Sequence, residues 1–189
     1  MTLDAGADGV MVPMVDTPDQ AEAVVRAAKF PPLGDRSFGG RRVIDTRGRM
    51  YAHTSNDATF LMAQIETPEG LENVDAIAAV DGVDIIFLGP DDMRLRRGER
   101  MDEPRSMEQL ERDMERVAEA GRANGKPCAM PAIGSEMIQL CQRIGFQIIC
   151  CGMDAAFLAD GSQAASQVAR KTLAEGSPVD VKGDPESLY

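Results

Sequence analysis

The sequence predicts an α/β protein built around a parallel sheet. Short apolar runs alternate with longer amphipathic stretches, and a run followed by a helical pattern occurs five times. The runs are rich in Val, Ile and Phe, and several are nearly continuous in apolar residues, as in strands buried on both faces. The predicted strands cover residues 9–15, 59–66, 83–89, 127–133 and 146–152.

Start and stop signals mark the predicted helices. Thr17 and Thr67 are expected N-caps, and each is followed by a proline at the first helical position. Two further helices are predicted over 106–125 and 135–145, each ending at a glycine, and a last one over 155–176. The same strand-then-helix unit therefore repeats along the chain.

Two connections are longer than the short loops of a simple α/β fold. Residues 31–57 are rich in Gly, Pro and Arg without clear periodicity, and residues 90–105 follow a predicted strand. Long loops inside a compact domain are usually functional or disordered. Arg36, in the first of these loops, could bind a carboxylate in bidentate fashion, or it could shape the loop or contact another subunit.

Five strand–helix units fit either an open doubly wound sheet or part of a (β/α)8 barrel. A full barrel has about 250 residues, so five eighths of it is about 155 residues, close to the span from Gly9 to the end of the last helix. Residues 3–10 read as the end of a helix that turns through Gly6 into a strand. We therefore expect an N-terminally truncated TIM-type barrel, represented by its last five β/α units over 1–176, with a tail over 177–189.

The composition narrows the class of protein. Of the 189 residues, 43% are hydrophobic and 27% charged, which is typical of a globular domain. The net charge of −11 argues against a nucleic-acid partner, since such proteins present basic surfaces. No stretch has the length of a membrane helix, and the first residues do not resemble a signal peptide, so we expect a cytoplasmic protein. Four cysteines without CxxC spacing indicate reduced, buried thiols rather than zinc ligands or disulfides.

Carboxylates follow two successive predicted strands. Glu66 ends the second strand, and Asp91 and Asp92 lie just past the third. Neighbouring parallel strands lie about 4.8 Å apart, so Glu66 and one of these aspartates would come close at the same edge. A few oxygen ligands without nearby His or Cys suit Mg²⁺ or Mn²⁺. The alternative, that these acids only cap the following helices, stays open at this point.

The segments LDAGADGVMVPMV, FPPLGDRSFGG and QIETPEGLENVDAIAAVDGVDIIFLGPDDM together resemble the HpcH/HpaI aldolase family over nearly the whole chain. These are class II pyruvate aldolases. The resemblance implies Glu66 and Asp92 as ligands of a divalent metal (Mg²⁺ or Mn²⁺, possibly Co²⁺) and Asp92 as part of the substrate site. It further implies that Gln64 binds substrate and that Asp91 offers its main-chain N–H to a pyruvate carboxylate. Asp4 matches an acid that supports the basicity of a catalytic histidine.

The implied reaction is metal-dependent cleavage of a 4-hydroxy-2-oxo acid into pyruvate and an aldehyde, in a homo-oligomer that is a trimer or hexamer in the family. The positions of the lysines argue independently against a Schiff-base aldolase. The family's catalytic His and a substrate-binding Arg have no counterpart in this sequence, and His53 matches neither motif. We therefore expect weak or absent activity from this chain alone. Two alternatives are a citrate lyase β-like lyase acting on a CoA ester and a non-catalytic metal-binding fragment.

Overall fold

The computed structural model describes residues 1–39 and 41–176 of the chain. The chain divides into two compact units, Met1–Cys151 and Gly152–Tyr189. The first unit contains the whole sheet, and the described part of the second contains a single helix. The predicted domain 1–176 thus spans both units, and the predicted tail 177–189 lies outside the described residues.

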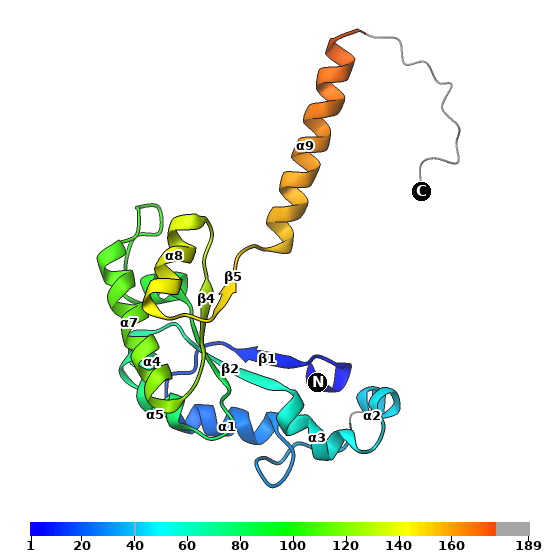
Figure 1. Cartoon of the computed structure of the whole chain (residues 1–189), viewed down its shortest axis with the longest axis vertical. Coiled ribbons are helices and arrows are strands. Elements are labelled where there is room, and N and C mark those ends of the chain that lie inside the picture. The colour runs from blue at the N-terminus through cyan, green and yellow to red at the C-terminus, as the bar shows by residue number, and fades with distance from the viewer. Residues whose placement is uncertain (40, 177–189) are drawn as a thin grey trace. The chain divides into compact units, whose positions relative to one another are not determined.

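Five parallel strands form one sheet in the order in which they occur along the chain (Figure 1). Gly9 is aligned with Phe60, Met62 with Ile85, and Ile65 with Leu88. The parallel α/β prediction is confirmed, although each strand is shorter than predicted. The strands are β1 (Gly9–Val12), β2 (Phe60–Ile65), β3 (Ile85–Leu88), β4 (Cys128–Pro131) and β5 (Ile148–Cys150).

The two faces of the sheet are covered differently. On β2, Leu61 and Ile65 belong to the main core, which also contains side chains from the flanking helices. Met62 faces the other way, onto a small separate cluster with Ile85, Phe87, Ala129 and Ile148. Doubly wound sheets reverse their strand order at a switch point and carry helices on both faces. Here the strands follow one another in sequence order, and the helices pack on one face of the sheet. The five strands therefore form a curled half-barrel and not a doubly wound sheet.

The helices that cover the face with Leu61 and Ile65 are α1 (Pro18–Ala28), α4 (Pro68–Glu72), α5 (Val74–Ala79), α7 (Met107–Asn124) and α8 (Ser135–Ile144). They lie where the sequence predicts them, except that the single helix expected after Thr67 is divided at Asn73 into α4 and α5. The hydroxyl of Thr17 accepts the Gln20 N–H as part of a capping box. α7 ends at Gly125 with φ of 64°, a left-handed conformation that glycine adopts without steric cost.

The prediction that residues 31–57 lack regular structure was wrong in its second half. α2 (Arg41–Arg47) and α3 (Tyr51–Ala58) lie there, and the residues after β3 likewise form α6 (Pro90–Arg96). Val43, Ile44 and Tyr51 form a small core with Phe30. These helices have only about two turns each, too few for a hydrophobic period to be visible among the arginines.

The remaining predictions were confirmed in part. A short 3-10 helix, η1 (Leu3–Ala5), ends at Gly6 and leads into β1, as expected. α9 (Asp154–Ala174), in the second unit, has no buried residue. Cys128 and Cys141 are buried free thiols, but Cys150 and Cys151 are exposed, contrary to expectation. Within the described residues, no helix combines the length and apolar character that a membrane span requires.

Candidate metal site at the ends of β2 and β3

Glu66 follows the last residue of β2 and is only 2% exposed. Its Oε1 accepts the backbone N–H of Met14 at 2.9 Å, and its Oε2 accepts the side-chain amide of Gln64. Both donors are neutral. The carboxylate is therefore oriented by two hydrogen bonds without having its charge balanced by them.

Gly89, directly after β3, makes room for this carboxylate. A Cβ at this position would lie 2.7 Å from Glu66 Oε2 and 2.8 Å from Gln64 Nε2. The φ of Gly89 is −100°, which any residue adopts, so the requirement for glycine comes from this close approach alone. The Gly89 N–H also donates to the carbonyl of Ile65 at 2.9 Å, which holds the ends of β2 and β3 together.

Further carboxylates surround Glu66. Burial raises the pKa of Glu66 above its ordinary value, and the nearby charges of Asp92 and Asp16 raise it further, while the hydrogen bonds from Met14 and Gln64 oppose the increase. Asp92 lies in the first turn of α6 and is partly exposed. The negative charges on these acids destabilise one another, and a bound cation would remove that repulsion.

Thr67, and not Glu66, caps the helix that follows β2. Its hydroxyl accepts the Gly70 N–H at 2.9 Å and donates to Asp16 Oδ1. Asn73 reinforces this corner by donating from Nδ2 to the carbonyl of Asp16 at 2.8 Å. The capping alternative for Glu66 therefore does not hold, and its carboxylate is left available for another partner.

Met14 is a site residue that the sequence analysis did not identify. Its φ of 54° is left-handed, and it is the one non-glycine residue with positive φ in the part of the chain described. This conformation turns the chain after β1 so that the Met14 N–H donates to Glu66. The sequence analysis placed Met14 inside the predicted strand 9–15, and nothing in the sequence indicates its left-handed conformation.

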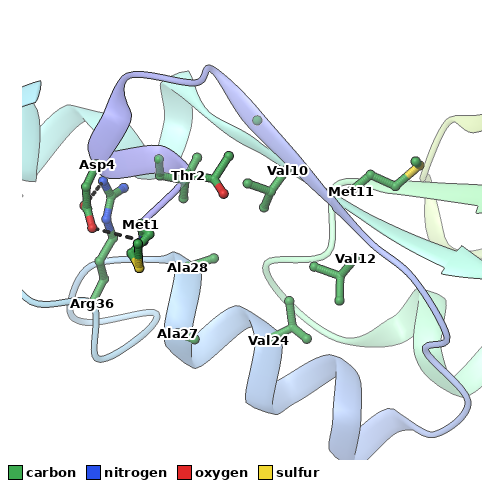
Figure 2. A pocket seen from close by; sticks show the side chains of 12 residues that line it. Met1, Thr2, Asp4, Val10, Met11, Val12, Val24, Ala27, Ala28 and Arg36 are labelled. Carbon is green, nitrogen blue, oxygen red and sulfur yellow. Dashed lines mark hydrogen bonds and ion pairs between the residues drawn. The ribbon is translucent and has the colours of Figure 1, made fainter.

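The predicted site residues are brought together only in part. Gln64, Glu66 and Asp92 lie at the carboxyl ends of β2 and β3. The side chain of Asp91 is 70% exposed and forms an ion pair with Arg105. Asp4 precedes β1, at the other end of the strands, and pairs with Arg36 Nη2 at 2.8 Å and with the N-terminal amine at 3.2 Å (Figure 2).

The donor set fits a divalent cation that takes few protein ligands. The described residues contain no group of three or more His, Cys, Asp and Glu side chains arranged to hold a metal. Two carboxylates leave several coordination positions to water and substrate, which suits Mg²⁺ or Mn²⁺ better than zinc. The buried, repelled carboxylate of Glu66 is the observation that supports this fit.

The fold and the site together define an α/β protein with paired carboxylates at the carboxyl ends of adjacent parallel strands. The chain belongs to the HpcH/HpaI aldolase/citrate lyase family, whose model matches residues 1–160. It is 36% identical over 161 residues to a 4-hydroxy-2-oxovalerate aldolase of Novosphingobium aromaticivorans, covering 85% of this chain and 61% of that protein. It is 34% identical over 163 residues to a 2-keto-3-deoxy-L-rhamnonate aldolase of Escherichia coli O1:K1 / APEC, covering 84% and 60%.

Solved structures show the same similarity. A HpcH/HpaI aldolase/citrate lyase family protein from Burkholderia cenocepacia J2315 superimposes with a TM-score of 0.77 at 32% identity, covering 89% of this chain and 67% of that one. The citrate synthase SbnG gives a TM-score of 0.74 at 26% identity, covering 90% and 66%. The chain spans about three fifths of the length of the curated relatives it matches.

Proposed function

We propose that this chain carries the metal site of a class II aldolase, a carbon–carbon lyase that cleaves 4-hydroxy-2-oxo acids into pyruvate and an aldehyde. The observation that supports it most is the buried carboxylate of Glu66, which has only neutral hydrogen-bond donors and lies near Asp92. The names of the relatives, both aldolases, support the reaction class.

Glu66 and Asp92 would hold the divalent ion, which is Mg²⁺, Mn²⁺ or Co²⁺. When bound, such an ion supplies positive charge beside the keto and carboxylate oxygens of a 2-oxo acid. Gln64 donates to the Glu66 carboxylate and is proposed to contact the substrate as well. The main-chain N–H of Asp91 is proposed to bind the substrate carboxylate, so its side chain is free to pair with Arg105.

The reaction breaks the C3–C4 bond after a base takes the proton of the C4 hydroxyl, and the electron pair stays on the pyruvate part. Asp4 is proposed to support a histidine base. Asp4 and Glu66 lie at opposite ends of the strands of one chain, so Asp4 can serve that role only for a base that approaches the amino end of β1. His53 is exposed on α3 and is not proposed as the base.

The remaining proposals follow from the family. We propose that the five β/α units are the last five of a (β/α)8-type barrel and that the protein assembles into trimers or hexamers; a cytoplasmic location stays a prediction from the sequence. Lyases acting on CoA esters are the second candidate, but the citrate lyase β subunit from M. tuberculosis is only 14% identical, which supports a common fold and no more. A non-catalytic metal-binding fragment is the third.

Calorimetry with Mn²⁺ tests the proposal directly. We expect one Mn²⁺ per chain, bound at least tenfold more weakly by Glu66→Gln and by Asp92→Asn, with far-UV circular dichroism unchanged. Pyruvate release from 4-hydroxy-2-oxovalerate, followed with a coupled dehydrogenase, then separates an aldolase from a metal-binding fragment. Wild-type Mn²⁺ affinity in both variants would refute the assignment of the metal ligands.

A further inference from the structure

The segment from Arg36 to His53 is basic, although the chain as a whole is strongly acidic. It contains five arginines and one aspartate, a formal charge of +4 in a chain of net charge −11. Arg41 pairs with Asp45 and Arg47 with Asp8, but Arg49 forms no ion pair with the described residues and instead lies over the ring of Phe38, 5.0 Å from its centroid. A local excess of positive charge of this kind favours an anionic ligand.

This segment forms one wall of a cavity of about 620 Å³. Its lining combines aromatic and basic side chains and includes no acidic residue; the main contributors are Phe30, Arg36, Phe38, Arg49, Met50 and His53. Cavities of a few hundred Å³ with apolar walls and a small number of polar groups are typical binding sites for small molecules.

One of the buried polar atoms without a partner belongs to Arg36, which lines the cavity. Within the described residues there are three of them, Arg36 Nη1, Tyr51 Oη and Ser55 Oγ, and their side chains are 8%, 4% and 1% exposed. Arg36 uses Nη2 for Asp4 (Figure 2). Its guanidinium lies 4.6 Å from the Phe30 ring centroid and 5.6 Å from that of Tyr51. Most buried polar groups in proteins have a partner, so an unpartnered Nη1 on a buried arginine that lines the cavity indicates a missing polar ligand or water.

The cavity is separate from the candidate metal site. Lys29, next to Phe30, donates from Nζ to the carbonyl of Thr59, the residue just before β2. Phe30 therefore lies at the amino end of the strands, whereas Glu66 lies beyond their carboxyl ends. A ligand in this cavity would not touch Gln64, Glu66 or Asp92, the residues of the candidate metal site; Asp4 adjoins the cavity only through its ion pair with Arg36.

We propose that this cavity binds a small organic anion with a flat apolar body and a carboxylate or phosphate group. Phe30, Phe38 and Met50 contact the body. Arg49 and the imidazole of His53 donate hydrogen bonds to the anionic group, and the unpartnered Nη1 of Arg36 provides a further, buried donor. This site is independent of the proposed aldolase activity and holds whether or not that activity is found.

Calorimetry with phenyl phosphate and with benzoate tests the site, using inorganic phosphate and benzyl alcohol as controls for the anionic group and for the ring. We expect at least one of the two aryl anions to bind the full chain with a Kd in the millimolar range or below, and each control to bind at least tenfold more weakly. The tighter aryl anion identifies the anionic group.

The exposed Arg49 provides the first variant. Arg49→Met should weaken aryl-anion binding about tenfold, the loss of one charge-assisted contact. The matched control Arg42→Met, an exposed arginine of the same segment outside the cavity lining, should leave binding unchanged. Arg36→Met should weaken binding at least as much, provided that circular dichroism shows a folded chain.

Glu66→Gln should not change aryl-anion binding, which separates this site from the metal site. Three outcomes would overturn the proposal: no binding of either aryl anion, equal loss in Arg49→Met and Arg42→Met, or binding of inorganic phosphate as tight as that of phenyl phosphate.

Discussion

Replacement of Gly89 by alanine tests the candidate metal site without removing any of its polar groups. The new Cβ would lie 2.7 Å from Glu66 Oε2 and 2.8 Å from Gln64 Nε2, whereas ordinary contacts begin at 3.4 Å. The carboxylate must move by roughly 0.7 Å, and two packed strand ends limit where it can go. Overpacking of this kind costs about 1–3 kcal/mol of unfolding free energy.

The same displacement should weaken Mn²⁺ binding. Changes that disturb the orientation of a metal ligand usually cost about 10- to 100-fold in affinity, and we expect Gly89→Ala to fall in that range. The measurements are Mn²⁺ calorimetry and urea unfolding of the metal-free protein, with Gly161→Ala as the control. Gly161 lies within α9 with open space around it, so alanine there should leave Mn²⁺ affinity unchanged. Wild-type affinity in Gly89→Ala would show that Glu66 is not a ligand.

Three further substitutions test the electrostatics and the backbone. Because folding raises the pKa of Glu66, the ionised carboxylate destabilises the metal-free fold above its unfolded pKa. Glu66→Gln should therefore be more stable than the wild type at pH 7 in urea melts, and the gain should vanish below about pH 4, where the carboxyl is protonated in both states. Saturating Mn²⁺ should reverse that order, and a less stable Gln variant in EDTA would contradict it. Lys29→Met should lose about 1–3 kcal/mol in urea unfolding, because the buried Lys29 Nζ donates to the carbonyls of Asn56 and Thr59, which the variant leaves without that donor; unchanged stability would refute its structural role. Met14→Gly should be about 1 kcal/mol more stable than Met14→Ala, the reverse of the usual order, because of its left-handed φ, and thermal melts of the two variants decide.

The sequence was sufficient to predict the parallel sheet and that the ends of β2 and β3 lie side by side. Short, nearly continuous apolar runs identify strands such as β2 and β3. Parallel pairing of these two strands then places Glu66 next to the residues that follow β3. No period of two or 3.6 marks α2 and α3, since each has about two turns and is held by only a few buried residues. They were therefore predicted as loop.

Met14 could not be predicted for a different reason. Its contribution is a backbone N–H in an unusual conformation, and the conformation depends on the turn after β1 and not on the methionine side chain. The hydrogen-bond partner of Arg36 could not be predicted from the sequence either. Whether a loop arginine meets a substrate or a distant aspartate depends on how the chain between them folds, and the structure pairs Arg36 with Asp4, 32 positions earlier in the sequence.

The strand register separates two chemically different environments. Gly9 is aligned with Phe60 and Ile65 with Leu88, so residues that precede β1 and β2 are held at one end of the sheet and those that follow β2 and β3 at the other. The carboxyl end contains Glu66 and Asp92, whose mutual repulsion favours a cation. The amino end contains Arg36 and the basic segment after it, where Asp4 keeps a lowered pKa because Arg36 donates to it. Asp4 therefore forms an ion pair with Arg36 and stays ionised well below neutral pH. A ligand at one end of this sheet should therefore not compete with a ligand at the other.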